Sequence, residues 1–341
     1  MNNSAKLNKK KYLFILLVAL VIFGLFYFFD KQYSENNLKK PVSFGVSYSP
    51  NYAKALGLDP KLIYQSIITN LNIKKVRLNA NWDEIEPEKD KFDFTSINYF
   101  IDQSTKNNID VTLAIGFKLP RWPECRSPKW LDPKDIELLR YRQLIMIEEV
   151  IKHYENNPTI KNWQIENEPL LTFGLCPPPD KHFLEKEIAF VRTLTKKPII
   201  ITGSGELSFS KTPIKLSDIF GTTLYRMVYV PILGQFQYPL PSWFYPLKSA
   251  LLKHFTPNQN QKTIVSELQT EVWTDRFLTS IPINEQVNSF PSSRIKSNII
   301  YAKQTGFDEI YLWGVEWWYY LASNNHPEYL DIVKLMLKDT L

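Results

Sequence analysis

Residues 162–169 read Asn-Trp-Gln-Ile-Glu-Asn-Glu-Pro, a short apolar run that ends in a cluster of polar side chains. Residues 162–165 have the composition of a buried β-strand, and Glu166, Asn167 and Glu168 follow where that strand should end. Parallel strands in (β/α)₈ barrels carry their functional side chains at this carboxyl end. The segment therefore predicts both a strand and a site, and similar segments lie on either side of it.

Seven further short apolar runs alternate with longer stretches that have apolar residues at three- and four-residue steps, which is typical of helices. Eight strands in βα alternation predict a parallel (β/α)₈ (TIM) barrel. A doubly wound open sheet is the alternative, but its Gly-rich phosphate turn is missing after the first strand. We expect strands at residues 43–47, 75–78, 111–115, 162–165, 198–202, 219–224, 263–266 and 309–313. The expected helices are 60–71, 95–107, 136–154, 181–194, 246–254, 283–305 and 326–337, and residues 206–217 should form a short irregular connection.

The composition is that of a globular protein, with 44% hydrophobic and 22% charged residues in 341. The net charge of +6 comes mainly from residues 1–41, which contain seven lysines against Asp30 and Glu35. The remaining chain carries a net charge of only +1, so no basic face for phosphates is expected. A nucleic-acid partner is therefore not predicted.

Residues 12–29 read YLFILLVALVIFGLFYFF, an uncharged run almost long enough to cross a hydrocarbon core of roughly 30 Å. Four lysines precede it, which favours an inside N-terminus. We expect a cytoplasmic N-terminus (1–11), a transmembrane anchor (12–29), a polar tether (30–41) and a barrel domain (42–341) outside the cytoplasm, in a single-pass cell-membrane protein. The alternative is a cleaved signal peptide and a secreted domain, although no small-x-small cleavage site follows the run.

The ends of the other expected strands add to the site. Glu267 follows the seventh strand, Arg77 lies in the second, and Trp313 ends the eighth. Two carboxyl groups facing each other across a sugar suit glycosidic cleavage, because one must be protonated and the other ionised. Arg77 would hold Glu267 in its charged form, and tryptophan rings at the rim would offer apolar faces to sugar C–H surfaces. Acids at strand ends are also often merely solvated, which is the alternative for each Glu taken alone.

Four segments resemble clan A glycoside hydrolases, which include the family-five cellulases and their relatives. WQIENEP (163–169) resembles the Asn-Glu-Pro signature of this clan, and IVSELQTEVW (264–273) is similar to its nucleophile strand. VRLNANWDEIEPEKDKFDF (76–94) resembles the start of its second βα unit, and LWGVEWWYY (312–320) its aromatic eighth strand. The resemblance covers about residues 42–325, but the His-x-Tyr motif that family-five enzymes often carry after strand six is missing.

This resemblance implies a retaining mechanism, with Glu168 as the general acid/base and Glu267 as the nucleophile. Asn167 would bind the sugar 2-hydroxyl, Arg77 would orient Glu267, and Tyr225 would donate a hydrogen bond to the nucleophile. A core or rim position is the alternative for Tyr225.

Aromatic and acidic residues near the same strand ends are further candidates for substrate contacts. Trp313 would form the floor of the subsite where the bond breaks, and Trp317 is the competing choice. Glu271 is a less favoured nucleophile, and Glu166 and Glu316 are either substrate contacts or ion-pair partners. Other rings expected to contact sugar are Trp82, Trp122, Trp130 and Trp243; loop packing is the alternative for these.

Cys125 and Cys176 are the only cysteines. An isolated pair in an exported domain suggests a disulfide, which would join the loops after strands three and four; two unpaired thiols are the alternative. The four histidines are not spaced as metal ligands, and neither a Gly-x-Ser-x-Gly elbow nor a Walker loop occurs. No metal or cofactor is therefore predicted.

The sequence thus predicts a membrane-anchored retaining glycoside hydrolase that acts on a β-linked glycan or oligosaccharide. A carbohydrate is the expected partner. The alternatives are an anchored carbohydrate-binding barrel without catalytic activity and a transglycosidase with the same site.

Overall fold

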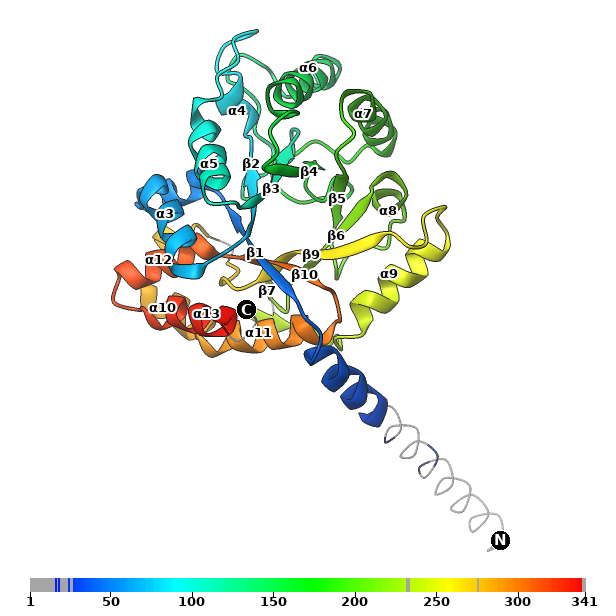
Figure 1. Cartoon of the computed structure of the whole chain (residues 1–341), viewed down its shortest axis with the longest axis vertical. Coiled ribbons are helices and arrows are strands. Elements are labelled where there is room, and N and C mark those ends of the chain that lie inside the picture. The colour runs from blue at the N-terminus through cyan, green and yellow to red at the C-terminus, as the bar shows by residue number, and fades with distance from the viewer. Residues whose placement is uncertain are drawn as a thin grey trace, which may run out of the picture.

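The computed structural model describes residues 16, 18, 24, 27–230, 234–274 and 276–338. Eight parallel strands close into a barrel in the order β1-β10-β9-β6-β5-β4-β3-β2, with the helices around it (Figure 1). The predicted (β/α)₈ barrel is therefore confirmed. Its strands are β1 (Ser43–Tyr48), β2 (Lys75–Asn79), β3 (Asp110–Ile115), β4 (Ile160–Ile165), β5 (Ile199–Gly203), β6 (Ile219–Leu224), β9 (Lys262–Gln269) and β10 (Glu309–Trp313).

The helices form where the apolar periodicity and the capping residues favour them. Asp59, for example, accepts hydrogen bonds from the first turn of α3, and Pro60 occupies the first helical position. The helices are α2 (Pro50–Ala55), α3 (Pro60–Leu71), α4 (Trp82–Ile85), α5 (Thr95–Lys106), α6 (Ile136–Tyr154), α7 (Lys181–Leu194), α8 (Thr212–Leu216), α9 (Phe244–His254), α10 (Ile283–Ser289), α11 (Ser293–Gln304), α12 (Val315–Ser323) and α13 (Glu328–Lys338).

The prediction of a single helix over 283–305 is wrong, because α10 ends before Pro291 and α11 begins after it. A proline lacks the N–H of the helical ladder and disfavours helical backbone in the residue before it. Phe290 accordingly has φ −138° and ψ 78°. The structure also contains elements that were not expected, namely the helices α2, α4 and α12, the 3₁₀ turn Leu278–Ser280 and an antiparallel hairpin of β7 (Met227–Val230) and β8 (Gly234–Gln237). The connection at 206–217, expected to be irregular, contains the short helix α8.

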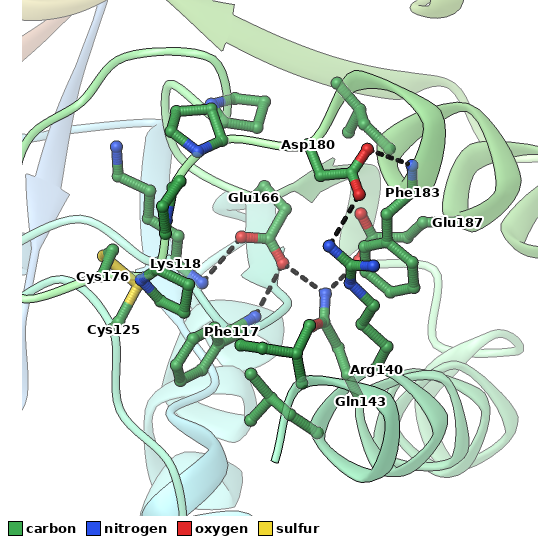
Figure 2. Close-up of a pocket in the computed structure, with 17 residues that line it drawn as sticks. Phe117, Lys118, Cys125, Arg140, Gln143, Glu166, Cys176, Asp180, Phe183 and Glu187 are labelled. Carbon is green, nitrogen blue, oxygen red and sulfur yellow. Dashed lines mark hydrogen bonds and ion pairs between the residues drawn. A yellow bond between two sulfur atoms is a disulfide. The ribbon is translucent and has the colours of Figure 1, made fainter. Parts of the chain in front are cut away.

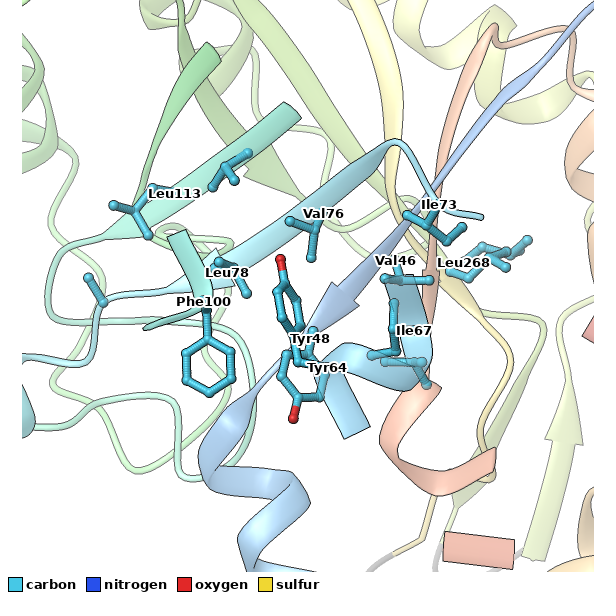
Figure 3. Packing of buried hydrophobic residues seen from close by; sticks show 14 of the residues in the cluster. Val46, Tyr48, Tyr64, Ile67, Ile73, Val76, Leu78, Phe100, Leu113 and Leu268 are labelled. Atoms are coloured by element: carbon cyan, nitrogen blue, oxygen red, sulfur yellow. The ribbon is translucent and has the colours of Figure 1, made fainter. Parts of the chain in front are cut away.

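Aromatic and aliphatic side chains pack together in the core between strands and helices (Figure 3). Tyr48 of β1, Tyr64 of α3 and Phe100 of α5 pack together, with ring centroids 5.3 Å apart for the two tyrosines and 5.2 Å for Tyr64 and Phe100. Both buried hydroxyls are satisfied, since Tyr48 donates to Pro60 O over 2.6 Å and Tyr64 bonds Ser104 Oγ at 2.6 Å. This packing holds α3 and α5 against the outer face of the barrel.

A helix at residues 27–38 precedes the barrel and projects from it (Figure 1). Tyr33 donates to Thr305 O over 2.8 Å, and Asn37 Nδ2 donates to Gln304 O over 3.0 Å. Both acceptors precede β10, so this helix contacts the end of the barrel where the strands begin. Most of the segment expected to be a polar tether (30–41) is therefore helical and bonded to the barrel.

Most of the apolar run at 12–29 lies outside the described residues. Within the part of the chain that the structure describes, no helix is both long and apolar enough to cross a membrane.

Candidate active site

Glu168 lies just past the carboxyl end of β4, where the backbone leaves the strand through left-handed conformations. Glu166 has φ +59° and Glu168 has φ +43°, a region that costs non-glycine residues energy and is common at functional sites. The turn is held by the neighbouring strand, because the Glu168 N–H donates to Thr202 Oγ1 of β5 over 2.8 Å. Thr223 of β6 donates to Glu168 Oε1 over 3.4 Å. The strand ends thus fix this carboxyl group over the barrel.

Glu267 lies within β9 and not after it, at an irregularity in the strand. Thr222 pairs with Val265 and Thr223 pairs with Glu267, so Ser266 is an extra residue on the β9 side. A bulge of this kind redirects the following side chain and is common next to active sites. Arg77 Nη1 then donates to Glu267 Oε1 over 2.7 Å, and Tyr225 Oη donates to Oε2 over 2.8 Å. Both oxygens of the carboxylate are therefore held by a donor.

The two expected catalytic carboxyl groups face the same space. Thr223 contacts Glu168 through its hydroxyl and pairs with Glu267 in the sheet. Burial raises the pKa of Glu168 well above the usual value, and the negative charges of Glu267 and Glu124 raise it further. The site therefore favours a protonated Glu168 beside a Glu267 that is bonded as a carboxylate.

Asn167 lies between these groups. Its Oδ1 accepts hydrogen bonds from Arg77 Nη2 over 2.9 Å and from Thr202 Oγ1 over 3.3 Å. Because both donors hold the amide oxygen, the Asn167 Nδ2 group points the other way, toward Glu124 Oε1 at 3.4 Å. Asn167, Arg77 and Tyr225 thus all lie around Glu267 or Glu168, as the sequence predicted.

Glu124 is a third acidic residue in this site that the sequence analysis missed. Burial raises its pKa to about 7, against the lowering effect of Lys118. Its Oε2 atom lies 3.3 Å from Lys118 Nζ, but it is buried and makes no hydrogen bond in the structure. The only signal in the sequence was its place beside Cys125 in the loop after the third strand.

Glu166 is also buried, and its carboxyl group contacts the loop after β3 and helix α6 (Figure 2). Its two carboxyl oxygens accept from the Phe117 N–H and the Lys118 N–H, each over 2.7 Å. Gln143 Nε2 of α6 donates to the same group over 2.8 Å and also contacts Glu187 of α7. Of the two readings given for Glu166, the contacts favour a structural one, since it fastens the β3 loop to the end of β4.

The disulfide that the cysteine pair suggested is present. Cys125 and Cys176 are bonded, with their Cα atoms 5.3 Å apart. Lys118 Nζ adds to this connection by donating to Glu168 O over 3.1 Å and to Leu171 O over 2.7 Å. The loops after β3 and β4 are therefore joined on both sides of Glu168.

Arg121 is a second residue that the sequence analysis missed. Its guanidinium lies between the rings of Tyr52 and Trp313, with its Cζ 3.9 Å from each ring centroid. It also pairs with Glu271 Oε1 over 2.6 Å and with Glu316 Oε2 over 2.7 Å. Glu271 and Glu316 are thus ion-pair partners of Arg121, and Trp313 has one ring face covered by a cation.

The remaining tryptophans are divided between the core and the rim. Trp82 and Trp317 are fully buried; Trp82 donates to Glu86 Oε2, and Trp317 donates to Gln286 Oε1 and packs on Phe290 and Tyr329. Neither offers a face to a substrate, so the two predictions of sugar contacts are corrected: both rings are core residues.

Trp122 is 46% exposed and lies at the rim, as expected. It contacts Phe173 of the β4 loop, which in turn contacts Trp273 after β9, each pair with ring centroids 6.0 Å apart. Trp130 donates to Glu86 O over 3.0 Å and so packs within the loops.

The closed barrel with two carboxyl groups at its strand ends resembles the clan A (β/α)₈-barrel glycoside hydrolases. Comparison with known proteins confirms this resemblance. Residues 64–143 match glycoside hydrolase family 42, described as beta-galactosidase. No curated protein matches the chain in sequence.

Three solved structures illustrate the shared fold. The chain is similar to an exo-β-1,4-mannosidase from Opitutaceae bacterium strain TAV5, with a TM-score of 0.53 and 14% identity over 80% of this chain and 51% of that one. A β-galactosidase from Bacillus circulans sp. alkalophilus has a TM-score of 0.53 and 14% identity, over 80% of this chain and 50% of its own. GH5_18 from Bifidobacterium longum subsp. longum has a TM-score of 0.59 and 11% identity, over 80% of this chain and 70% of its own. The chain thus spans about half the length of the first two proteins, and the likeness shows a common fold.

Proposed function

We propose that this chain is a retaining glycoside hydrolase that cleaves β-linked glycans or oligosaccharides. The observation that carries the proposal is the unequal environment of two acidic residues in one site. Glu267 is bonded as a carboxylate by Arg77 and Tyr225, whereas burial and nearby negative charge raise the pKa of Glu168. Double displacement needs one ionised and one protonated carboxyl group at the outset.

In the first step, Glu267 attacks the anomeric carbon while Glu168 donates its proton to the glycosidic oxygen, so that the C–O bond to the leaving group breaks. The product is a covalent glycosyl ester of Glu267. In the second step, Glu168, now ionised, accepts a proton from water, and the water oxygen displaces Glu267 from the anomeric carbon. The configuration at that carbon is inverted twice and therefore retained.

Carbohydrate as the substrate class is supported by the similar structures, which include GH5_18 from Streptomyces cattleya in complex with GlcNAc. The β-galactosidase and exo-β-mannosidase among them favour a β-linked substrate. The apolar run at 12–29 supports the further proposal of a single-pass anchor that leaves the barrel outside the cytoplasm, with a secreted form after signal cleavage as the alternative.

The test uses the full chain with 4-nitrophenyl and 2,4-dinitrophenyl β-glycosides of mannose, galactose and glucose. We expect Glu267→Ala to lose turnover of both aglycones and to form an α-glycosyl azide when azide is added. We expect Glu168→Ala to lose far more activity on 4-nitrophenyl glycosides than on 2,4-dinitrophenyl glycosides. The 2,4-dinitrophenolate is the better leaving group and departs without a proton from an acid. Glu137→Ala, at an exposed position on α6, is the matched control.

The outcomes separate the alternatives. Unchanged turnover in Glu267→Ala would show that Glu267 is not the nucleophile. Binding of the sugars without turnover by wild type indicates a carbohydrate-binding barrel, and transfer of the glycosyl group to added sugar in preference to water indicates a transglycosidase.

A further inference from the structure

The loop after β3 forms a short tongue, defined here as residues 118–125, with Arg121 at its tip. Its base is closed by an antiparallel bridge between Lys118 and Cys125 and by a hydrogen bond from Leu119 N–H to Glu124 O over 3.0 Å. Its tip is a tight turn, in which the Glu124 N–H donates to Arg121 O over 2.8 Å. Arg121 has φ +85°, so the turn holds a non-glycine residue in the left-handed region.

The tongue crosses the mouth of the barrel. Near its tip, Pro120 O accepts from Asn79 Nδ2 at the end of β2 over 2.8 Å. The Arg121 side chain then reaches Tyr52 after β1, Trp313 at the end of β10, and Glu271 after β9. In the barrel order these strands are consecutive neighbours, β3-β2-β1-β10-β9. One half of the mouth is therefore spanned by the tongue.

Arg121 is held firmly in this position. Its side chain is only 8% exposed, and two carboxylates pair with it, of which Glu316 is fully buried. Glu316 is itself fixed, because its Oε1 accepts from the Ser49 N–H over 2.5 Å. Withdrawing the guanidinium would leave buried carboxylates without a partner, which is strongly unfavourable. The tongue is thus a fixed wall.

The proposed acid/base lies beside the base of the tongue, where Lys118 Nζ donates to Glu168 O, and its carboxyl group lies over the half of the mouth away from the Arg121 tip. Glu168 follows β4 and contacts Thr202 of β5 and Thr223 of β6. Because Glu168 gives its proton to the leaving oxygen, the aglycone departs on this side. The far end of the sugar ring, which carries the 4-hydroxyl group opposite the reacting carbon, then points toward the half that the tongue covers.

We propose that the Arg121 tongue closes the glycone side of the site, so that the pocket holds one sugar unit and the enzyme releases only terminal residues from non-reducing ends. This exo action rests on the proposed glycosidase function. A glycan that continued beyond the bound sugar on its non-reducing side would have to pass through the position of the Arg121 guanidinium and its ion-pair partners.

The test compares two versions of one oligosaccharide. The wild-type chain is incubated with reducing-end-labelled β-1,4-linked tetrasaccharides of mannose, galactose and glucose, either free or with a 4,6-O-benzylidene group on the terminal sugar. We expect single sugars to be released from the free tetrasaccharide and the blocked one to be cleaved at less than a hundredth of that rate. Release of blocked fragments at a comparable rate overturns the inference, because it requires internal cleavage.

A variant then tests the role of the tongue itself. Arg121→Ala combined with Glu271→Gln removes the wall and one of the two charges that would lose their partner. We expect the ratio of blocked to free turnover to rise at least tenfold, with Arg126→Ala, just outside the tongue, as the control that leaves the ratio unchanged. An unchanged ratio in a variant that unfolds at the wild-type temperature overturns the assignment to Arg121.

The wild-type experiment tests the exo inference even if the double variant does not fold. A chain that turns over none of the aryl β-glycosides contradicts the proposed function. A chain that turns them over but cleaves blocked tetrasaccharides internally contradicts only the exo inference.

Discussion

Tyr225, the residue after β6, donates a hydrogen bond from its Oη to Oε2 of Glu267, which follows the bulge in β9, over 2.8 Å. Arg77 holds the other oxygen. The carboxylate is therefore held from two sides, and in the proposed mechanism the attacking oxygen would lose one of these bonds when the glycosyl ester forms.

Tyr225→Phe is expected to lower kcat/KM on aryl β-glycosides by roughly 10- to 100-fold, since a hydrogen bond to a charged group contributes about 1.5–3 kcal/mol. Steady-state kinetics would measure the loss, with Tyr229→Phe in the nearby hairpin as the control. Equal rates for wild type and Tyr225→Phe would show that this bond plays no part in catalysis.

The pH profile should depend on Glu124. The proposed mechanism requires a protonated Glu168, so kcat/KM is expected to fall as pH rises through the pKa of Glu168, which burial and the charges of Glu267 and Glu124 raise. Glu124→Gln removes one of these negative charges and should move the alkaline limb to lower pH. If the alkaline limb of the kcat/KM profile lies at the same pH in Glu124→Gln as in wild type, the charge of Glu124 does not act on Glu168.

The same residue should make stability depend on pH. Because burial raises the Glu124 pKa to about 7, the folded chain binds more protons than the unfolded chain between about pH 4.5 and 7. The stabilising contribution is complete below that range and is lost as pH rises through 7. We expect the thermal midpoint of Glu124→Gln to fall less between pH 5 and 8 than that of wild type or Glu137→Gln. Parallel curves would contradict this assignment.

The disulfide should contribute to stability as well as to the site. Its cysteines are 51 positions apart, and closing a loop of that length stabilises the folded state by roughly 2–4 kcal/mol. Cys125→Ser combined with Cys176→Ser should lower the midpoint of urea unfolding accordingly. The control is wild type in the presence of a reductant, which should approach the variant. Identical midpoints for the oxidised wild type and the variant would count against the prediction.

Much of the fold followed from local patterns. The helices Pro60–Leu71, Ile136–Tyr154 and Lys181–Leu194 have the predicted bounds, because periodicity and capping residues define them locally. The break at Pro291 was missed although its signal is local, since the periodicity continues on both sides of it. The hairpin of β7 and β8 was missed because its pairing depends on two short strands inside a loop.

The site was predictable where side chains lie near the carboxyl ends of barrel strands. Glu168, Glu267, Arg77 and Asn167 meet because parallel strands converge at one end. Arg121 and Glu124 were not predictable, since a tongue of eight residues decides which strand ends they reach. Trp82 and Trp317 were misplaced for a related reason: each follows a strand, but the short helix that carries it turns the ring into the core.

The hydrogen bonds from Tyr33 to Thr305 and from Asn37 to Gln304 also orient the whole molecule. They fasten the leading helix at the pole of the barrel opposite to Glu168 and Glu267. If the proposed anchor at 12–29 holds the chain at a membrane, the strand ends that carry Glu168 and Glu267 face away from that membrane. In the proposed function, the glycan would then approach the site from the side opposite to the attachment.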